Sequence, residues 1–199
     1  MSQFIETIRI FDGKVDLIDS HNERFNATRK LFFCVDEGQN LKQSIQIPEL
    51  FRKGVVKCRI VYDIEIREIQ FSFYEEKNTS ILKPIEANVS YAYKSIDRNQ
   101  LNELKMRAWP ADEVLILKNG MVSDTSFSNL IFSKNGQWFT SNTPLLAGIR
   151  REQLLNDGVV EECEISYADL KNYDHFMLIN AMLPFDQKKA IPIRNIQTL

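Results

Sequence analysis

Lys94 and Asp124 are the first residues whose types and surroundings could do chemistry. Lys94 follows an extended stretch at 89–93 and precedes a predicted helix, so the fold could hold its amine and partly withdraw it from water. Desolvation lowers the pKa of a lysine and makes its amine a nucleophile for carbonyl compounds. Asp124 lies just past a turn at Asn119-Gly120, where a carboxylate could pair with a cationic ring nitrogen. Taken one at a time, such residues are more often a solvated lysine and a turn-capping aspartate.

A glycine before a predicted helix, in Gly148-Ile149-Arg150, indicates an anion site, because the first N–H groups of a helix lie at the positive end of its dipole. Arg24, on another predicted helix, could add a forked guanidinium to the same anion. A loop glycine and a solvated arginine are the ordinary alternatives. Together, a lysine amine for an aldehyde, an acid for a ring nitrogen and a cradle for a phosphate form the set that pyridoxal 5′-phosphate requires.

The first part of the chain predicts a sheet and a helix that would position Arg24. Residues 4–11 alternate in strand fashion, and Asp12-Gly13 predicts a hairpin turn. One face of this strand carries Phe4, Glu6, Ile8 and Ile10. The other expected elements are a returning strand at 14–18, a helix at 21–33 capped at Asp19-Ser20, a short helix at 40–46, a helical turn from Pro48 to Gly54, and strands at 55–63 and 64–74.

The second part predicts the elements around Lys94 and Asp124. A helix is expected at 97–108, and another is opened by Gly148 and ends near Gly158. Strands are expected at 89–93, 114–117, 129–133, 137–140, 159–165, 175–179 and 191–193, with hairpins across Asn119-Gly120 and Asn135-Gly136. The fold class expected is therefore mixed α/β (α+β), with a smaller N-terminal domain at 1–80 and a larger C-terminal domain at 81–199 that carries Lys94.

Composition excludes several classes of function. The chain has 199 residues, 44% of them apolar, and a net charge of −2, so it lacks the basic field that nucleic-acid binding needs. Three widely spaced cysteines and only two histidines argue against a metal site and for a reduced, cytoplasmic location. The first ten residues carry Glu6 and Arg9, so we expect no signal peptide there, and no apolar run nears the roughly 20 residues of a membrane helix. We expect no metal, no nucleic acid and no membrane partner.

Several ordered blocks resemble the class IV (fold type IV) pyridoxal-phosphate enzymes, which include branched-chain aminotransferases, D-amino-acid aminotransferases and 4-amino-4-deoxychorismate lyases. Residues 4–13 resemble the family's opening strand and turn, and His21-Asn22-Glu23-Arg24 resembles its H-x-x-R motif. Residues 94–98 are similar to the block around the lysine that binds the cofactor. The remaining blocks are 124–132 (E-x-x-x-x-N-[LI]-F), 143–151 (T-P…L-x-G-I-x-R, the most specific) and 180–184 (the lyase's N-A-L-M-P).

The resemblance implies a two-domain fold type IV enzyme, similar to D-amino-acid aminotransferase and N-terminally shortened. It also implies a homodimer that binds pyridoxal 5′-phosphate and a small-molecule amino substrate. Lys94 would be the catalytic residue, binding the cofactor aldehyde and then acting as general base at the substrate Cα. The cofactor-binding residues implied are Arg24, Lys94, Asp124, Gly148, Ile149, Arg150, Asn180, Ala181 and Met182.

Three departures from the family pattern bear on activity. Members usually carry a further segment before the opening strand, including a Y-G-D-G loop beside the site. Their ring-nitrogen partner is usually Glu, where this chain has the shorter Asp124. Arg150 stands where Thr is frequent, and its backbone N–H can still bind phosphate.

The leading hypothesis is a 4-amino-4-deoxychorismate lyase-like enzyme of folate biosynthesis, releasing pyruvate and 4-aminobenzoate. The alternative is a class IV aminotransferase for branched-chain or D-amino acids, in which Lys94 would return the proton at the cofactor's C4′ carbon. That reaction needs a group for the substrate carboxylate, and Arg98, Arg107 and Arg151 are the candidates. A further hypothesis is a non-catalytic homologue that binds the cofactor or serves as a dimeric scaffold. The joint presence of Lys94, Arg24 and Gly148-Ile149 argues against it.

Overall fold

The computed structural model describes residues 2–199, which divide into two compact units. The first comprises residues 2–76 and the returning segment Tyr93–Asp97, and the second comprises Lys77–Ala92 and Arg98–Leu199. Lys94 therefore groups with the first unit, whereas from the sequence it is expected in the larger C-terminal domain. The physical reason is a backbone hydrogen bond, since the Ile5 N–H donates to the Lys94 carbonyl oxygen at 2.9 Å.

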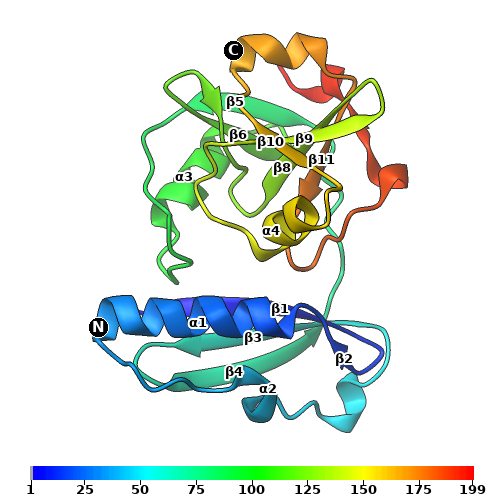
Figure 1. The fold of residues 1–199 in the computed structure, drawn as a ribbon. Coiled ribbons are helices and arrows are strands. Elements are labelled where there is room, and N and C mark those ends of the chain that lie inside the picture. Colours follow the sequence, from blue (N-terminus) through cyan, green and yellow to red (C-terminus); the bar gives the residue numbers. More distant parts are fainter. Residues whose placement is uncertain (1) are drawn as a thin grey trace. The chain divides into compact units, whose positions relative to one another are not determined.

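The first unit is a four-stranded antiparallel sheet with one long helix against it (Figure 1). The strand order is β2-β1-β3-β4, and apolar side chains of the helix α1 (Ile18–Phe33) join those of the sheet in one core. Ile8, Ile10 and Phe25 have no exposed surface in it, and such burial is the main driving force for the unit. The other elements are β1 Phe4–Phe11, β2 Lys14–Val15, α2 Leu41–Ser44, η1 Glu49–Phe51, β3 Val55–Tyr62 and β4 Ile66–Phe73.

The start of α1 differs from the prediction. The helix begins at Ile18, before the expected cap at Asp19-Ser20. Leu17 precedes it in the left-handed backbone region at φ 47°, and no side chain caps the first turn. The Asp16 N–H donates to the Arg9 carbonyl oxygen at 2.8 Å, so the chain passes from the hairpin directly into the helix. The C-terminal end of the helix agrees with the prediction.

The second unit contains two sheets and two helices (Figure 1). One sheet has the order β10-β9-β8-β11-β12 and the other β5-β6-β7. Helix α3 (Asn99–Arg107) packs on β6, and α4 (Ile149–Asn156) shares a core with the five-stranded sheet. The other elements are β5 Leu82–Glu86, β6 Glu113–Lys118, β7 Met121–Val122, β8 Asn129–Lys134, β9 Gln137–Ser141, β10 Glu161–Cys163, η2 Tyr167–Asn172, β11 His175–Ile179, η3 Gln187–Lys189, β12 Ile191–Pro192 and η4 Ile193–Asn195.

Two segments near Lys94 and β6 depart from the prediction. Residues 89–93 form no strand, because they have no neighbouring strand with which to form a ladder, and only an isolated bridge joins Ser95 to Phe4. Conversely, β5 is a strand that is not predicted from the sequence. It pairs in parallel with β6 at the edge of its sheet, a position that tolerates Pro84. Both Asn-Gly hairpins and the helix opened by Gly148 are confirmed.

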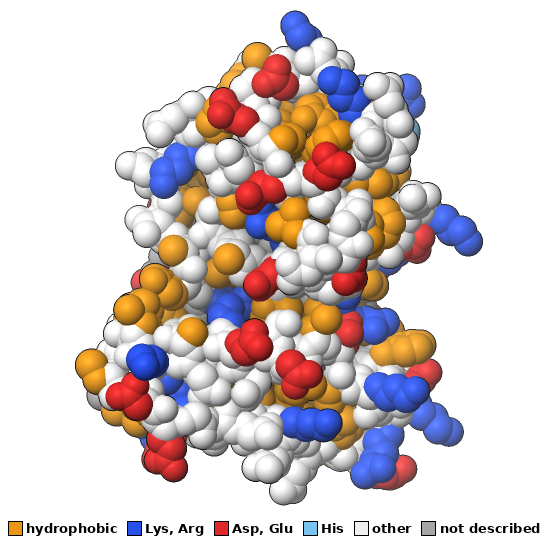
Figure 2. All heavy atoms as spheres, in the orientation of Figure 1, with side chains coloured by type: hydrophobic (Ala, Val, Ile, Leu, Met, Phe, Trp, Pro, Cys, Tyr) orange, Lys and Arg blue, Asp and Glu red, His pale blue; other side chains and the backbone are white. Residues whose placement is uncertain are grey.

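Figure 2 shows acidic and basic side chains mixed with scattered hydrophobic ones on the face in view. This mixture accords with the small net charge of −2. Within residues 2–199, no helix combines the length and the apolar composition that crossing a bilayer demands.

Candidate functional site

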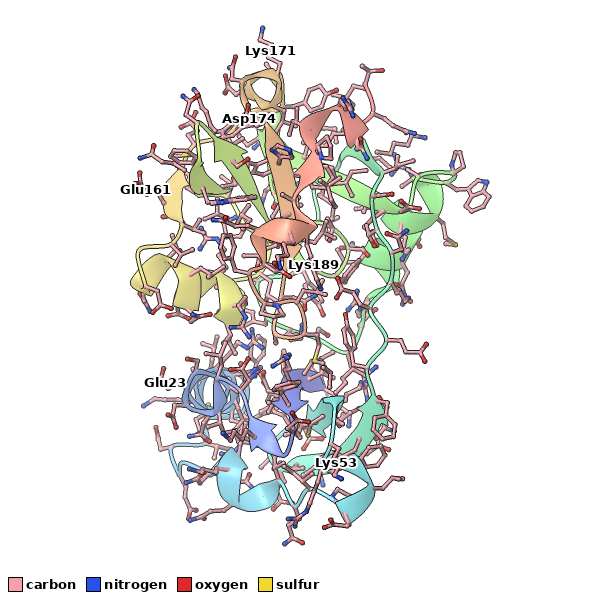
Figure 3. The ribbon with its side chains drawn as sticks, turned by 90° about the vertical axis from the view of Figure 1, so that its right-hand side faces the viewer. Glu23, Lys53, Glu161, Lys171, Asp174 and Lys189 are labelled. Atoms are coloured by element: carbon pink, nitrogen blue, oxygen red, sulfur yellow. The ribbon has the colours of Figure 1, made fainter. Side chains whose placement is uncertain are left out.

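Arg24 is held by a buried carboxylate in the first unit. Glu6 on β1 and His21 on α1 are both fully buried. Arg24 Nε donates to Glu6 Oε1 at 2.9 Å, and Arg24 Nη2 donates to Glu6 Oε2 at 2.6 Å. His21 Nδ1 lies 2.6 Å from the same Oε2. Glu23, between them in the sequence, is exposed and points away from the helix (Figure 3). The forked pair fixes the direction of the Arg24 guanidinium.

The ionisation of Glu6 follows from these neighbours. Burial is the largest single effect and acts to raise its pKa. The charge of Arg24 and the hydrogen bonds from His21 and Arg24 together outweigh burial and hold the pKa of Glu6 at about 2, against an ordinary 4.5. Because an ionised carboxylate can only accept hydrogen bonds, His21 presents Nδ1–H to it. His21 Nε2 is buried and has no hydrogen-bond partner among residues 2–199.

Lys94 lies beside the strand that carries Glu6. Its carbonyl oxygen accepts from the Ile5 N–H, and the next residue, Ser95, forms an antiparallel bridge with Phe4. These bonds fix the Lys94 backbone against the N-terminal end of β1. The first unit therefore brings two predicted site residues, Lys94 and the Glu6-bound arginine, to one strand.

In the second unit, Asp124 is 5% exposed, and its carboxyl accepts three hydrogen bonds. Oδ1 accepts from Asn129 Nδ2 at 2.8 Å, and Oδ2 accepts from the backbone N–H groups of Leu145 and Leu146, each at 3.0 Å. Burial raises the pKa of Asp124 to about 6, although these hydrogen bonds and the charge of Arg151 act in the opposite direction. A cation placed against this carboxylate would stabilise its ionised form.

The segment that binds Asp124 leads into the start of α4. Gly148 is the N-cap residue, at φ −78° and ψ 133°, and no side-chain hydrogen bond caps the helix. A Cβ atom at Gly148 would lie 1.9 Å from Asn129 Oδ1. Since any residue can adopt this backbone conformation, the glycine is needed for space. The backbone N–H groups of the first turn of α4, from Ile149 onward, point toward the N-terminal end of the helix, which is where helices bind anions.

Asn180, Ala181 and Met182 form a turn in the same unit. Asn180 Oδ1 accepts from the Met182 N–H at 2.8 Å, and Asn180 Nδ2 donates to Ser128 Oγ at 2.9 Å. Arg150 Nη2 lies 3.5 Å from the Ala181 carbonyl oxygen. Three segments that are far apart in the sequence thus meet in this unit: 124–129, 145–150 and 180–183. They contain every cofactor-binding residue predicted in the second half of the chain.

The three arginines considered as ligands for a substrate carboxylate have different surroundings. Arg151 is buried and donates to the Ser141 carbonyl oxygen at 2.8 Å, so its guanidinium supports the fold. Arg107 is exposed at the end of α3. Arg98 donates to the Ser126 carbonyl oxygen at 2.7 Å, in the loop that carries the buried acid. Arg98 is therefore the best placed of the three.

Glu6, His21 and Asn129 belong to the candidate site although none of them is assigned to it from the sequence. A signal for Glu6 was present, because it is the one charge on a strand face that is otherwise apolar. His21 stood in the H-x-x-R motif and Asn129 in the block after the acid, but their contacts depend on how distant segments pack.

Each of the two units combines sheet and helix. The first holds Lys94 and Arg24 beside strand β1, and the second holds the buried Asp124 near the start of α4. This is the fold of the fold type IV class of enzymes. The fold agrees with solved structures of that class. The chain belongs to the family described as amino-transferase class IV, whose model matches residues 3–196. The fold class and the family expected from the sequence are confirmed.

Individual relatives cover nearly the whole chain. A crystal structure of a "putative 4-amino-4-deoxychorismate lyase" from Haemophilus somnus is similar with a TM-score of 0.84 and 33% identity, over 93% of this chain and 98% of that one. An uncharacterised protein of Haemophilus influenzae is 35% identical over 185 residues, 92% of this chain and 98% of its own. A "putative aminodeoxychorismate lyase" of Schizosaccharomyces pombe is 26% identical, over 90% of this chain and 86% of its own.

Proposed function

We propose that this protein is a pyridoxal 5′-phosphate-dependent enzyme that cleaves 4-amino-4-deoxychorismate. The observation that carries the proposal is the Asp124 carboxylate, buried and bound to the amides of residues 145–146, just before the α4 N-terminus at Gly148. The acid for a cationic ring nitrogen is thus hydrogen-bonded to the segment that leads into the amide donors for a phosphate. The names of the Haemophilus somnus and Schizosaccharomyces pombe relatives support the lyase reaction.

The residues present fit the cofactor in charge and in hydrogen-bonding capacity. Arg24 and the amides of residues 148–150 would bind its phosphate, and the turn at 180–182 would border it. Lys94 would bind its aldehyde, and Asp124 would face its ring nitrogen. When bound, the cofactor supplies a sink for the electron pair that remains when a proton leaves the amino-bearing carbon of the substrate.

Lys94 would hold and move the proton in the reaction. Its free amine would take the proton from the amino-bearing ring carbon as a general base. The bond from the neighbouring ring carbon to the enolpyruvyl oxygen then breaks, and this group leaves as pyruvate after taking up a proton. The substrate ring becomes aromatic, giving 4-aminobenzoate. Asp124 would stabilise positive charge on the cofactor's ring nitrogen, and Glu6 keeps Arg24 oriented.

Product analysis tests the lyase reaction. Purified protein loaded with the cofactor is expected to convert 4-amino-4-deoxychorismate to equal amounts of pyruvate and 4-aminobenzoate. The Lys94→Ala protein should form neither, whereas a Lys53→Ala protein, changed at an exposed lysine of the same unit (Figure 3), should retain the activity. Absence of both products from the loaded wild-type protein would contradict the proposal.

A class IV aminotransferase acting on branched-chain or D-amino acids is the second candidate function, because the family model is itself named for amino transfer. The same side chains would serve, and Arg98 would be the first residue to test for contact with the substrate carboxylate. Exchange of an amino group between an amino acid and a keto acid, without release of 4-aminobenzoate, would favour this candidate. Both assays should be run on one preparation.

We also propose a cytoplasmic homodimer. The resemblance supports the dimer, since sites of this family lie near a dimer interface. A reducing compartment is supported by the unpaired state of Cys34, Cys58 and Cys163 in the described part of the chain. Sedimentation equilibrium should give twice the chain mass of 23.2 kDa. A monomer that is fully loaded and active would contradict the dimer.

A further inference from the structure

Asn129 connects the buried acid to the segment that precedes α4. Its Nδ2 donates both to Asp124 Oδ1 at 2.8 Å and to the Leu146 carbonyl oxygen at 2.9 Å. The other carboxyl oxygen of Asp124 accepts from the Leu146 N–H at 3.0 Å. A closed ring of hydrogen bonds therefore joins the first residue of β8, the loop before it and the segment at 145–148.

The carbonyl side of the Asn129 amide meets Gly148. Because Nδ2 serves two acceptors, Oδ1 is the atom directed at the glycine, and a Cβ there would lie 1.9 Å from it. Gly148 has an ordinary extended backbone, so it leaves room for the amide and does not supply an unusual turn. The amide of Asn129 therefore occupies the space that a side chain at residue 148 would fill.

We propose that Asn129 is a positioning residue that holds the Asp124 carboxylate at a fixed distance from the first amides of α4. The carboxylate is the proposed partner of the ring nitrogen, and these amides are the proposed phosphate ligands. This inference rests on the proposed cofactor. The ring and the phosphate belong to one small ligand, so a carboxylate that drifts relative to the amides cannot engage both ends together. The shorter side chain of Asp has less reach than Glu to correct such drift.

Removing the Asn129 amide has a second consequence. Asp124 Oδ1 would lose the hydrogen bond from Asn129 Nδ2 while the carboxyl stays buried, which disfavours its charged form. The pKa of Asp124 would rise further above its ordinary value, and the protonated acid would no longer pair with a cationic ring. Position and charge of the carboxyl therefore both depend on Asn129.

Binding of two ligands to the apoprotein tests this role without measuring turnover. Pyridoxal 5′-phosphate and its 1-deaza analogue share the aldehyde and the phosphate, but the analogue has a carbon in place of the ring nitrogen. The wild-type protein should prefer the natural cofactor. Asn129→Leu should lower that preference by about tenfold, chiefly through weaker binding of the cofactor. Gly148→Ala, which pushes the amide away from the other side, should lower it in the same direction.

Thr140→Val is the matched control. It removes a buried hydrogen bond from Thr140 Oγ1 to the Leu130 carbonyl oxygen, 2.8 Å, in the same sheet, and should leave the preference unchanged. An unchanged preference in both Asn129→Leu and Gly148→Ala would overturn the inference and leave the proposed function standing. A wild-type protein that binds neither ligand, or both equally, would overturn the proposed cofactor contact of Asp124 and the inference with it.

Discussion

Replacement of Glu6 by Gln should destabilise the first unit in a pH-dependent way. Gln has nearly the shape of Glu but no charge, so it cannot neutralise Arg24 or accept at both oxygens from Arg24 and His21. Glu6 is fully buried, so solvent does not screen the change. The variant also leaves the guanidinium of Arg24 without its buried counter-ion.

The magnitude follows from the pKa of Glu6. A fall from 4.5 to about 2 corresponds to about 3 kcal/mol of stability at neutral pH. The folded-state pKa lies below the unfolded value, so this contribution is complete above the unfolded pKa. It is lost as the pH falls through the folded pKa. The difference between the wild-type and Glu6→Gln proteins should therefore shrink to about 1.5 kcal/mol near pH 3.

Urea unfolding of the two proteins at neutral and acidic pH measures this difference. Glu68→Gln is the control, because Glu68 is half exposed and its Oε2 lies 3.9 Å from Arg59 Nη1. Loss of this surface charge should change the free energy of unfolding little at either pH. A Glu6→Gln difference that is near zero at neutral pH, or that grows as the pH falls, would refute the electrostatic account of the Arg24 anchor.

Two further predictions concern Arg24 in the first unit and Asp124 in the second. Arg24→Lys keeps the charge but loses the forked guanidinium that Glu6 orients. The dissociation constant of pyridoxal 5′-phosphate, measured by absorbance titration, should therefore rise about tenfold. The control Arg59→Lys should leave this constant unchanged. Because burial raises the folded-state pKa of Asp124 to about 6, its carboxyl should lower the free energy of unfolding of the apoprotein as the pH rises from about 4 to 6. Urea titrations of Asp124→Asn should lack this fall, and an identical pH profile would contradict the raised pKa.

The elements that local patterns specify could be predicted from the sequence. The Asn-Gly hairpins and the helix after Gly148 depend on turn chemistry within a few residues, and they are present. The strand β5 could not be recognised in this way, because Pro84 is typical of a connection and is tolerated only at a sheet edge. Residues 89–93 show the opposite case, since β-rich composition produces no strand without a partner.

The same distinction between local pattern and tertiary packing applies to the candidate site. Residue types and a family resemblance point to Lys94, Arg24 and Asp124 from the sequence alone. Their supports arise from tertiary packing, as when Glu6 meets Arg24 across 18 positions of the chain or Asp124 meets the Leu145 amide across 21. No local pattern encodes such a contact, although a lone charge on an apolar strand face marks where to look.

The most direct test of the account is to find the residue that holds the cofactor. The protein loaded with pyridoxal 5′-phosphate should be reduced with borohydride, digested and mapped by mass spectrometry. The account predicts a pyridoxyl mass on the peptide that contains Lys94 and its absence from the Lys94→Ala protein. The same mass on another lysine, or on none while the cofactor remains bound, would contradict it.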